Sequence, residues 1–375
     1  MKARNKYLIF SAPHKTTYSN ISPVLDLLDN SINLIYLCQC NFYTENKKMC
    51  KIVKDEYKIT TYCLKNPFKF KKYYDPNILQ KIFVKIYLKI FLRKTIKLAS
   101  SYIFCPGGLV EATVAKSIYK QGKKTIMIEG GFPLDLIKKN EYKFYQKIFV
   151  KLFINHTINN PLKYVTKLIV AGDFSKELRI KNGFETSKIS ALGVPRNKNL
   201  FYVQDKTNRI AYDIIFLTGS FKFHGDIENY LMQSNYVKQL TEYSTLNKIK
   251  VLIQVHPRDL EDYKVYKNDF VSITHENLVS NIQSSKICLS FYSTAVYESL
   301  LLNTDAFFVG KKLTNYWPEN DLLLDQKNFS KLAQLLSESM KETIDSKKNI
   351  AYKHISKDSV DSANKIKELL LEDVI

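Results

Sequence analysis

The sequence predicts an α/β protein built from two similar domains, each a parallel sheet covered by helices. Short apolar runs of strand length alternate with helix-length segments along most of the 375 residues, which is typical of doubly wound parallel sheets. This alternation breaks once, at residues 190–200, and then restarts. A chain of this length also exceeds one typical hydrophobic core, so two domains are expected.

In the first half, the apolar runs are followed in turn by helical patterns. Tyr7–Ser11 precedes a helix near Ile21–Leu28, and Leu168–Ala171 precedes one near Ser175–Lys181. A strand followed by a helix is the repeating unit of a parallel sheet. The other predicted strands are Asn33–Leu37, Tyr57–Cys63, Tyr102–Cys105 (followed by Pro-Gly-Gly and a helix near Val110–Gln121) and Thr125–Ile128.

The break at Ser190–Leu200 (SALGVPRNKNL) is polar and contains Gly193 and Pro195, which suits a domain junction. We therefore predict Rossmann-like domains at residues 1–193 and 194–375. A terminal helix near Val360–Leu371 is expected to pack back on the first domain. The strands predicted after the junction are Asp213–Leu217, Val251–Val255, Phe270–Ile273, Ile287–Ser290 and Ala306–Val309.

The composition indicates a globular protein without a resident metal. Hydrophobic residues make up 45% of the chain, whereas Pro and Gly number only 10 and 11, so a disordered or fibrous chain is disfavoured. No run of 18 apolar residues predicts a membrane span, and the N-terminus looks like a first strand rather than a signal peptide. No CxxC pair predicts a zinc ribbon or a redox motif, so we expect free thiols in a reducing cytosol at Cys38, Cys40, Cys50, Cys63, Cys105 and Cys288.

Basic residues recur every fourth position between Gln80 and Leu98, within a chain of net charge +21. On a helix this spacing draws a cationic stripe that drifts slowly around an apolar surface. Two interpretations stay open: the solvated edge of a core helix, or a surface that binds anionic membranes. Nucleic acid is disfavoured because the pattern is too apolar. The stripe comprises Lys81, Lys85, Lys89, Arg93 and Lys97, a second KIFVK copy occupies Lys147–Lys151, and the lipid-facing aromatics would be Phe83, Tyr87, Phe91, Phe149 and Phe153.

Two candidate site loops follow predicted strands directly. Glu129 ends the run MIE and is followed by two glycines, so we expect its carboxylate to be exposed in a loop that a substrate can approach. The run IQV is followed by His256, Pro257 and Arg258, at a strand end where open α/β sheets hold ligands. A histidine and an arginine together suit a phosphate. The alternative for this second loop is a simple turn with a surface imidazole.

A third candidate loop, after Ile287–Ser290, is rich in hydroxyl groups. Ser293 or Thr294 can cap the next helix, whose free N-terminal amides would favour a phosphate. Glu298, one turn into that helix, is placed to reach a ribose hydroxyl. An ordinary capped helix is the alternative. No GxGxxG or P-loop motif occurs, which removes the main support for a dehydrogenase or a P-loop NTPase.

These three loops resemble parts of known families. STAVYESLLLNTDAFFVG looks like the nucleotide-binding segment of GT-B glycosyltransferases and their epimerase relatives, in which two Rossmann-like domains face each other across a cleft. By this resemblance Glu298 holds the donor's ribose. HPR resembles the HP motif of bacterial sialyl-, polysialyl- and Kdo-transferases, which implies that His256 contacts the phosphate of a CMP-activated sugar. IEGG is similar to their acid-acid-Gly motif, with Glu129 as base and Ile128 at the first acidic position.

The resemblance implies a metal-independent, inverting glycosyltransferase that needs no cofactor besides its nucleotide-sugar donor. It would move a CMP-activated ulosonate onto a capsule, lipooligosaccharide or other surface glycan, from the inner face of the cytoplasmic membrane. Glu129 would act as base, His256 and Arg258 would stabilise the phosphate, and Ser293 and Thr294 would fix it. The alternatives are a UDP-sugar glycosyltransferase, an epimerase, a non-catalytic membrane or nucleic-acid adaptor, and a CDP-polyol phosphotransferase, since GVPRN resembles the junction of CDP-glycerol phosphotransferases.

Overall fold

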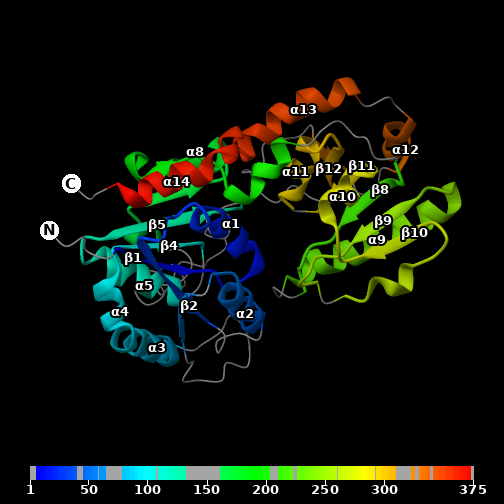
Figure 1. Ribbon diagram of the computed structural model, residues 1–375. Coiled ribbons are helices and arrows are strands. Elements are labelled where there is room, and N and C mark those ends of the chain that lie inside the picture. Colours follow the sequence, from blue (N-terminus) through cyan, green and yellow to red (C-terminus); the bar gives the residue numbers. More distant parts are fainter. Residues whose placement is uncertain are drawn as a thin grey trace. The chain divides into compact units, whose positions relative to one another are not determined.

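The computed structural model confirms an α/β protein with two parallel sheets (Figure 1). It describes residues 6–39, 45–57, 59–64, 78–106, 109–131, 161–202, 210–222, 226–259, 261–291, 293–309, 322–325, 329–337 and 341–372. The chain divides into two compact units. The first contains Met1–Lys198 together with Ile355–Ile375, and the second contains Asn199–His354.

The boundary falls after Lys198, and not after Gly193. Residues 194–198 stay with the first unit because they are tied to it by packing and hydrogen bonds. Val194 is buried in its core, and the Val194 N–H donates to Ser359 Oγ at 3.3 Å. Arg196 donates to the carbonyl of Gly130 at 3.0 Å.

The first sheet is a parallel Rossmann-like sheet in which both faces are covered. Along β1 the side chains alternate, with Phe10 in one core cluster and Ile9 in the other. One cluster packs against α1, α2 and α14, and the other against α3, α4 and α5. The strand order is β3-β2-β1-β4-β5-β6-β7, with β1 Lys6–Ser11, β2 Ile32–Cys38, β3 Thr60–Cys63, β4 Ser101–Phe104, β5 Lys124–Glu129, β6 Lys167–Val170 and β7 Ile189–Ser190.

The helices of the first unit differ in places from the predicted ones. The first begins at Lys15, well before Ile21, because His14 and Thr17 form a capping box. Tyr57 ends α2 and does not start a strand, since its hydroxyl bonds to Asp26 and its ring packs against Tyr18. The helices are α1 Lys15–Leu25, α2 Glu45–Tyr57, α3 Ile78–Phe91, α4 Arg93–Leu98, α5 Leu109–Tyr119, α8 Asp173–Lys181 and α14 Ser362–Leu371, with 3-10 turns at Pro161–Tyr164, Thr186–Lys188 and Lys357–Val360.

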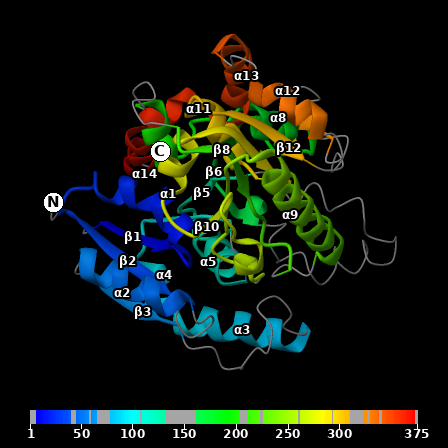
Figure 2. The same cartoon turned by 90° about the vertical axis from the view of Figure 1, so that its right-hand side faces the viewer.

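The predicted terminal helix is α14, and it belongs to the first unit. Ile366 and Leu370 are buried in the core cluster that contains residues of α1. Lys124 of β5 donates to the Leu369 carbonyl at 3.0 Å. Figures 1 and 2 show α14 close to α1.

The second sheet repeats the doubly wound plan, with β8 and β11 at its centre. The chain moves outward through β9 and β10 on one side and through β12 and β13 on the other, so the strand order reverses between β8 and β11. The strands are β8 Tyr212–Leu217, β9 Val251–Gln254, β10 Val271–Thr274, β11 Ser285–Ser290, β12 Asp305–Val309 and β13 Leu323–Leu324. The helices are α9 Ile227–Asn247, α10 Leu278–Gln283, α11 Ala295–Leu301, α12 Phe329–Ser337 and α13 Lys341–His354, with 3-10 turns at Pro195–Phe201, which spans the unit boundary, and at Tyr263–Tyr266.

No helix among the described residues is long and apolar enough to cross a bilayer.

Candidate functional site: the carboxyl edge of the second sheet

Three loops of the second unit meet at one edge of its sheet. β8 lies between β9 and β11, and all three strands are parallel. Their carboxyl ends therefore lie side by side, at the point where the strand order reverses. Open α/β sheets bind ligands at this position. The structure thus brings the His256 loop and the Ser293 loop to either side of the loop that follows β8.

His256 is held in a defined orientation at this edge. Its side chain is exposed, and its backbone N–H donates to Thr218 Oγ1 at 2.9 Å. The backbone N–H of Arg258 donates to His256 Nδ1 at 3.1 Å. Because Nδ1 accepts a hydrogen bond, the neutral ring carries its proton on Nε2. The imidazole therefore offers an N–H donor to a ligand.

Arg258 does not continue an extended strand. The chain turns at Pro257 and Arg258, and the Asp259 N–H donates to the His256 carbonyl at 2.8 Å. The side chain of Arg258 is half-buried. Strand alternation therefore does not fix its direction, and its role in phosphate binding stays a prediction.

The Ser/Thr turn after β11 uses part of its polar capacity internally. Ser293 Oγ accepts the Ala295 N–H at 3.2 Å, and the Ser293 carbonyl accepts the Val296 N–H at 3.1 Å. The expectation of free amides at this helix start is therefore wrong for those two groups. Thr294 is the N-cap residue of α11 but makes no side-chain cap bond. Glu298 is half-buried one turn further along.

Sequence reasoning missed the central loop, Thr218-Gly219-Ser220. Gln233 of α9 is fully buried and clamps Gly219 like a neighbouring strand. Its Oε1 accepts the Gly219 N–H at 2.6 Å, and its Nε2 donates to the Gly219 carbonyl at 3.2 Å. The run TGS after the predicted strand Asp213–Leu217 was the available signal. The partner Gln233 carried none, because it is contributed by a distant helix.

The same glutamine connects this loop to the histidine turn. Gln233 Nε2 lies 2.9 Å from the Tyr263 hydroxyl, and that hydroxyl donates to Asp259 Oδ2 at 2.8 Å. Burial, together with the Asp259 carboxylate, raises the pKa of Tyr263, so its hydroxyl stays protonated and can donate. These bonds hold the β8 and β9 loops in fixed register, as a preformed binding site requires.

Glu129 lies in the first unit, in a setting that differs from the predicted one. It is the last residue of β5, and only 4% of its surface is exposed. Arg179 of α8, also buried, donates from Nε to Glu129 Oε2 at 3.1 Å and from Nη2 to Oε1. The expectation of an exposed carboxylate is therefore wrong. The residue ends the strand too early to reach the loop, and the guanidinium covers both of its oxygens.

Further buried polar groups gather at the carboxyl edge of the first sheet. Glu111 accepts hydrogen bonds from Gln39 and, at 3.2 Å, from Ser11. Asn20 packs so closely on Gly130 that a Cβ there would lie 2.5 Å from Asn20 Nδ2. The glycine after Glu129 is thus needed for close packing as well as for any substrate approach.

The basic stripe of the sequence forms two consecutive helices, α3 and α4, and not one. Val84, Leu88 and Leu92 are buried on the core side. The opposite side is apolar and exposed: Ile86 and Ile90 are 52% and 72% exposed. Other exposed apolar residues are Ile82, Phe83, Phe91 and Leu98, and the exposed basic residues are Lys89, Arg93, Lys94 and Lys97. Tyr87 is half-buried. The second KIFVK copy, with Phe149 and Phe153, lies outside the described residues.

Comparisons with known proteins give structural matches only. No protein-family model matches the chain, and no curated protein matches its sequence. The UDP-GlcNAc 2-epimerase of Methanocaldococcus jannaschii is similar in structure, with a TM-score of 0.60 at 14% identity, covering 98% of this chain and 99% of that one. The UDP-GlcNAc 2-epimerase of Neisseria meningitidis, bound to UDP-GlcNAc, gives 0.60 at 13% identity with the same coverage.

A third similar structure is the wall teichoic acid polymerase TagF soaked with CDPG. It has a TM-score of 0.56 at 14% identity, and the match covers 98% of this chain and 88% of that chain. At these identities the matches establish the fold. The protein has the two-sheet GT-B fold that the sequence predicted.

Proposed function

We propose that the protein is a nucleotide-sugar-processing enzyme that holds the nucleotide of a UDP-sugar at the carboxyl edge of its second sheet. The observation that carries this proposal is the convergence of the His256, Thr218 and Ser293 loops at adjacent strand ends. The similarity of the whole chain to an epimerase bound to UDP-GlcNAc supports the choice of nucleotide.

The chemistry of these loops suits a diphosphate. The His256 imidazole presents Nε2–H as a donor, and the Arg258 guanidinium adds a permanent positive charge nearby in sequence. The hydroxyl of Thr294 is available to a phosphate oxygen, and the Glu298 carboxylate suits the hydroxyl groups of a ribose. These groups would also stabilise the charge that develops on the leaving phosphate.

Transfer to a surface glycan acceptor requires a base, and Glu129 remains our candidate. To accept a proton, one of its oxygens must leave Arg179, so substrate binding would have to displace one arm of the ion pair. Epimerisation is the second candidate reaction, supported by the epimerase matches, and it requires no acceptor. Transfer from a CMP-ulosonate or a CDP-polyol, and a non-catalytic adaptor, are separate outcomes of the ligand tests below.

Replacing His256 by alanine should weaken UDP binding by about 10- to 100-fold. A hydrogen bond to a charged group contributes about 1.5–3 kcal/mol, which corresponds to that change in affinity. The dissociation constant is measured by calorimetric titration of the full chain.

His275→Ala is the matched control for this test, because His275 is an exposed histidine that follows the neighbouring strand β10. It should leave UDP affinity unchanged. Equal losses in both variants, or none in His256→Ala, would refute the assignment of His256.

We also propose that α3 and α4 bind the anionic inner face of the cytoplasmic membrane. The outer side of α3 combines exposed isoleucine and phenylalanine with Lys89 and Arg93 at its flank. Apolar side chains that enter the lipid boundary beside cations that meet anionic headgroups are typical of interfacial helices. Charge complementarity favours lipid over a second copy of this strongly basic chain.

Flotation with anionic vesicles should bring the protein to the lipid fraction and decline as salt rises, because salt screens the charges. The triple variant Lys85→Glu/Lys89→Glu/Arg93→Glu should lose most of this binding, and Ile86→Asn/Ile90→Asn should lose it even at low salt.

A matched control changes the same number of charges in the second unit, at the exposed residues Lys238, Lys264 and Lys267. It should float like the wild type. Unchanged flotation of both α3 variants would show that the stripe is a solvated edge, and a concentration-dependent dimer abolished by the isoleucine changes would assign the surface to a second copy.

A further inference from the structure

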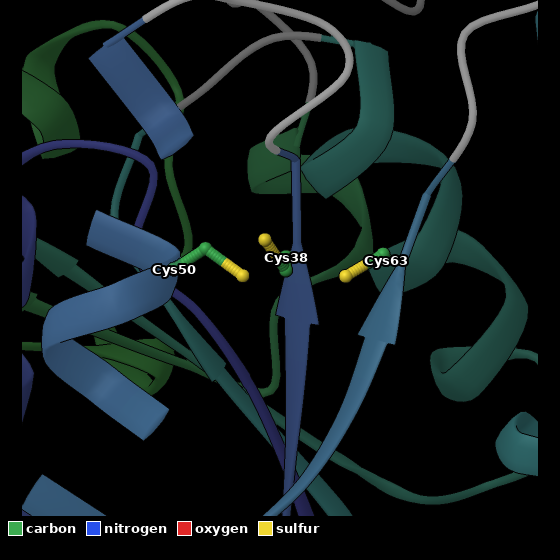
Figure 3. A group of neighbouring side chains, drawn as sticks. All are labelled: Cys38, Cys50 and Cys63. Carbon is green, nitrogen blue, oxygen red and sulfur yellow. The ribbon is translucent and has the colours of Figure 1, made fainter. Parts of the chain in front are cut away.

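Three cysteines of the first unit come together at one corner of its sheet. Cys38 ends β2, Cys63 ends β3, and Cys50 lies on α2. Cys38 and Cys63 are direct partners in the parallel pairing of their strands, so their side chains leave the sheet on the same face. Figure 3 shows the three thiols pointing toward one another, with Cys38 between Cys50 and Cys63.

The distances suit a single metal ion. All three Sγ atoms lie within 4.8 Å of one another. Sulfur ligands about 2.3 Å from a Zn²⁺ ion lie about 3.8–4.0 Å apart, so small rotations of the side chains would complete the site. Within the described part of the chain, these residues form the one group of three potential metal ligands.

The surroundings resemble those of a structural metal site more than those of a reactive thiol. Cys38 and Cys50 are buried among apolar residues that include Met49 and Val53, whereas Cys63 is half-buried. A buried apolar shell limits water around the ion, and the half-buried side gives an entry path. β3 is the edge strand of the sheet, so a shared ion would fasten both this edge and α2 to β2.

We propose that Cys38, Cys50 and Cys63 bind one thiophilic divalent metal ion of the Zn²⁺ type. The thiols lose their protons to solvent as three metal–sulfur bonds form, and a water or small exogenous ligand fills the fourth position. The ion would serve the first unit structurally. This site is independent of the nucleotide site, whose residues lie in the second unit.

Cobalt titration of the full, reduced, metal-free chain tests this proposal directly. We expect a thiolate-to-cobalt charge-transfer band that saturates at one equivalent and disappears when Zn²⁺ is added. Proton release should accompany binding, because the ligands must be deprotonated. Absence of the band, or a signal that never saturates, would overturn the proposal and leave the cysteines as packed thiols.

Cys63→Ser and Cys50→Ser should each weaken cobalt binding by at least about 100-fold, since even the loss of an outer hydrogen-bond partner costs 10- to 100-fold. Cys288→Ala is the control. Burial raises the pKa of the Cys288 thiol to about 12, so it stays protonated, and the residue lies in the second unit. Unchanged binding in both serine variants would refute the assignment.

Wild-type protein alone supplies a test that does not depend on variants that fold. Zn²⁺ should protect Cys38, Cys50 and Cys63 from alkylation in mass spectrometry, and it should not change the labelling of Cys288. A disulfide between two of the three, in protein purified without oxidant and unaffected by Zn²⁺, would contradict the metal site.

Discussion

Replacing Arg179 by methionine will lower the stability of the first unit by about 3–5 kcal/mol, because it leaves the Glu129 carboxylate buried without its counter-charge. Hydrogen exchange resolved by peptide is the appropriate measurement, since it separates the opening of β5 from events in the second unit. Faster exchange across Lys124–Glu129, with the second sheet unchanged, is the expected result.

The double variant Glu129→Leu/Arg179→Met should recover most of this loss, because well-packed apolar residues often replace a buried ion pair without cost. A double variant as unstable as the single one would contradict this account of the pair.

Catalysis separates the two roles of Glu129. Glu129→Gln should lower turnover by roughly 10²-fold or more if the carboxylate is the base. Arg179→Met removes the partner and spares the carboxylate, so its folded fraction should keep more turnover than Glu129→Gln. Equal turnover losses in the two variants would make the ion pair structural, and wild-type turnover in Glu129→Gln would exclude the base.

Gly193→Ala should destabilise the first unit by about 2–5 kcal/mol. Gly193 has a φ of +73°, which costs an L-residue about 1–2 kcal/mol. A Cβ there would also lie 2.7 Å from the Ser359 nitrogen and 2.8 Å from its Cα, and such overpacking costs about 1–3 kcal/mol more. Hydrogen exchange in α14 should rise, since this contact holds the returning segment.

Gly183→Ala separates the two contributions. Gly183 has a similar φ of +85°, but nothing lies within 4 Å of an added Cβ. It should show the conformational penalty alone, about 1–2 kcal/mol. If both variants are equally destabilised, close packing against Ser359 contributes nothing.

The fold was predictable because its strands are buried on both faces. Such strands read as continuous apolar runs, and the predicted Asp213–Leu217 and Ile287–Ser290 match β8 and β11 closely. The two-residue strands β7 and β13 are too short to carry a pattern. The break between α3 and α4 was missed because the apolar spacing continues through Leu92.

The candidate site was only partly predictable, because pairing partners come from distant segments. The His256 and Ser293 loops were identified because each directly follows an apolar strand. Neither Arg179 nor Gln233 has a local signal, since each meets its partner only through the packing of a helix on the sheet. The cysteine group likewise depends on the pairing of β2 with β3, while Cys40 lies outside the described residues.

Calorimetric titration of the full chain with UDP, CMP, CDP and GDP tests the central claim most directly. The account predicts one bound nucleotide per chain, with UDP the tightest and with affinity reduced in His256→Ala. Preference for CMP or CDP would keep the site and move the donor to an ulosonate or a polyol. Failure of all four nucleotides to bind at millimolar concentration would contradict a nucleotide site at the carboxyl edge of the second sheet.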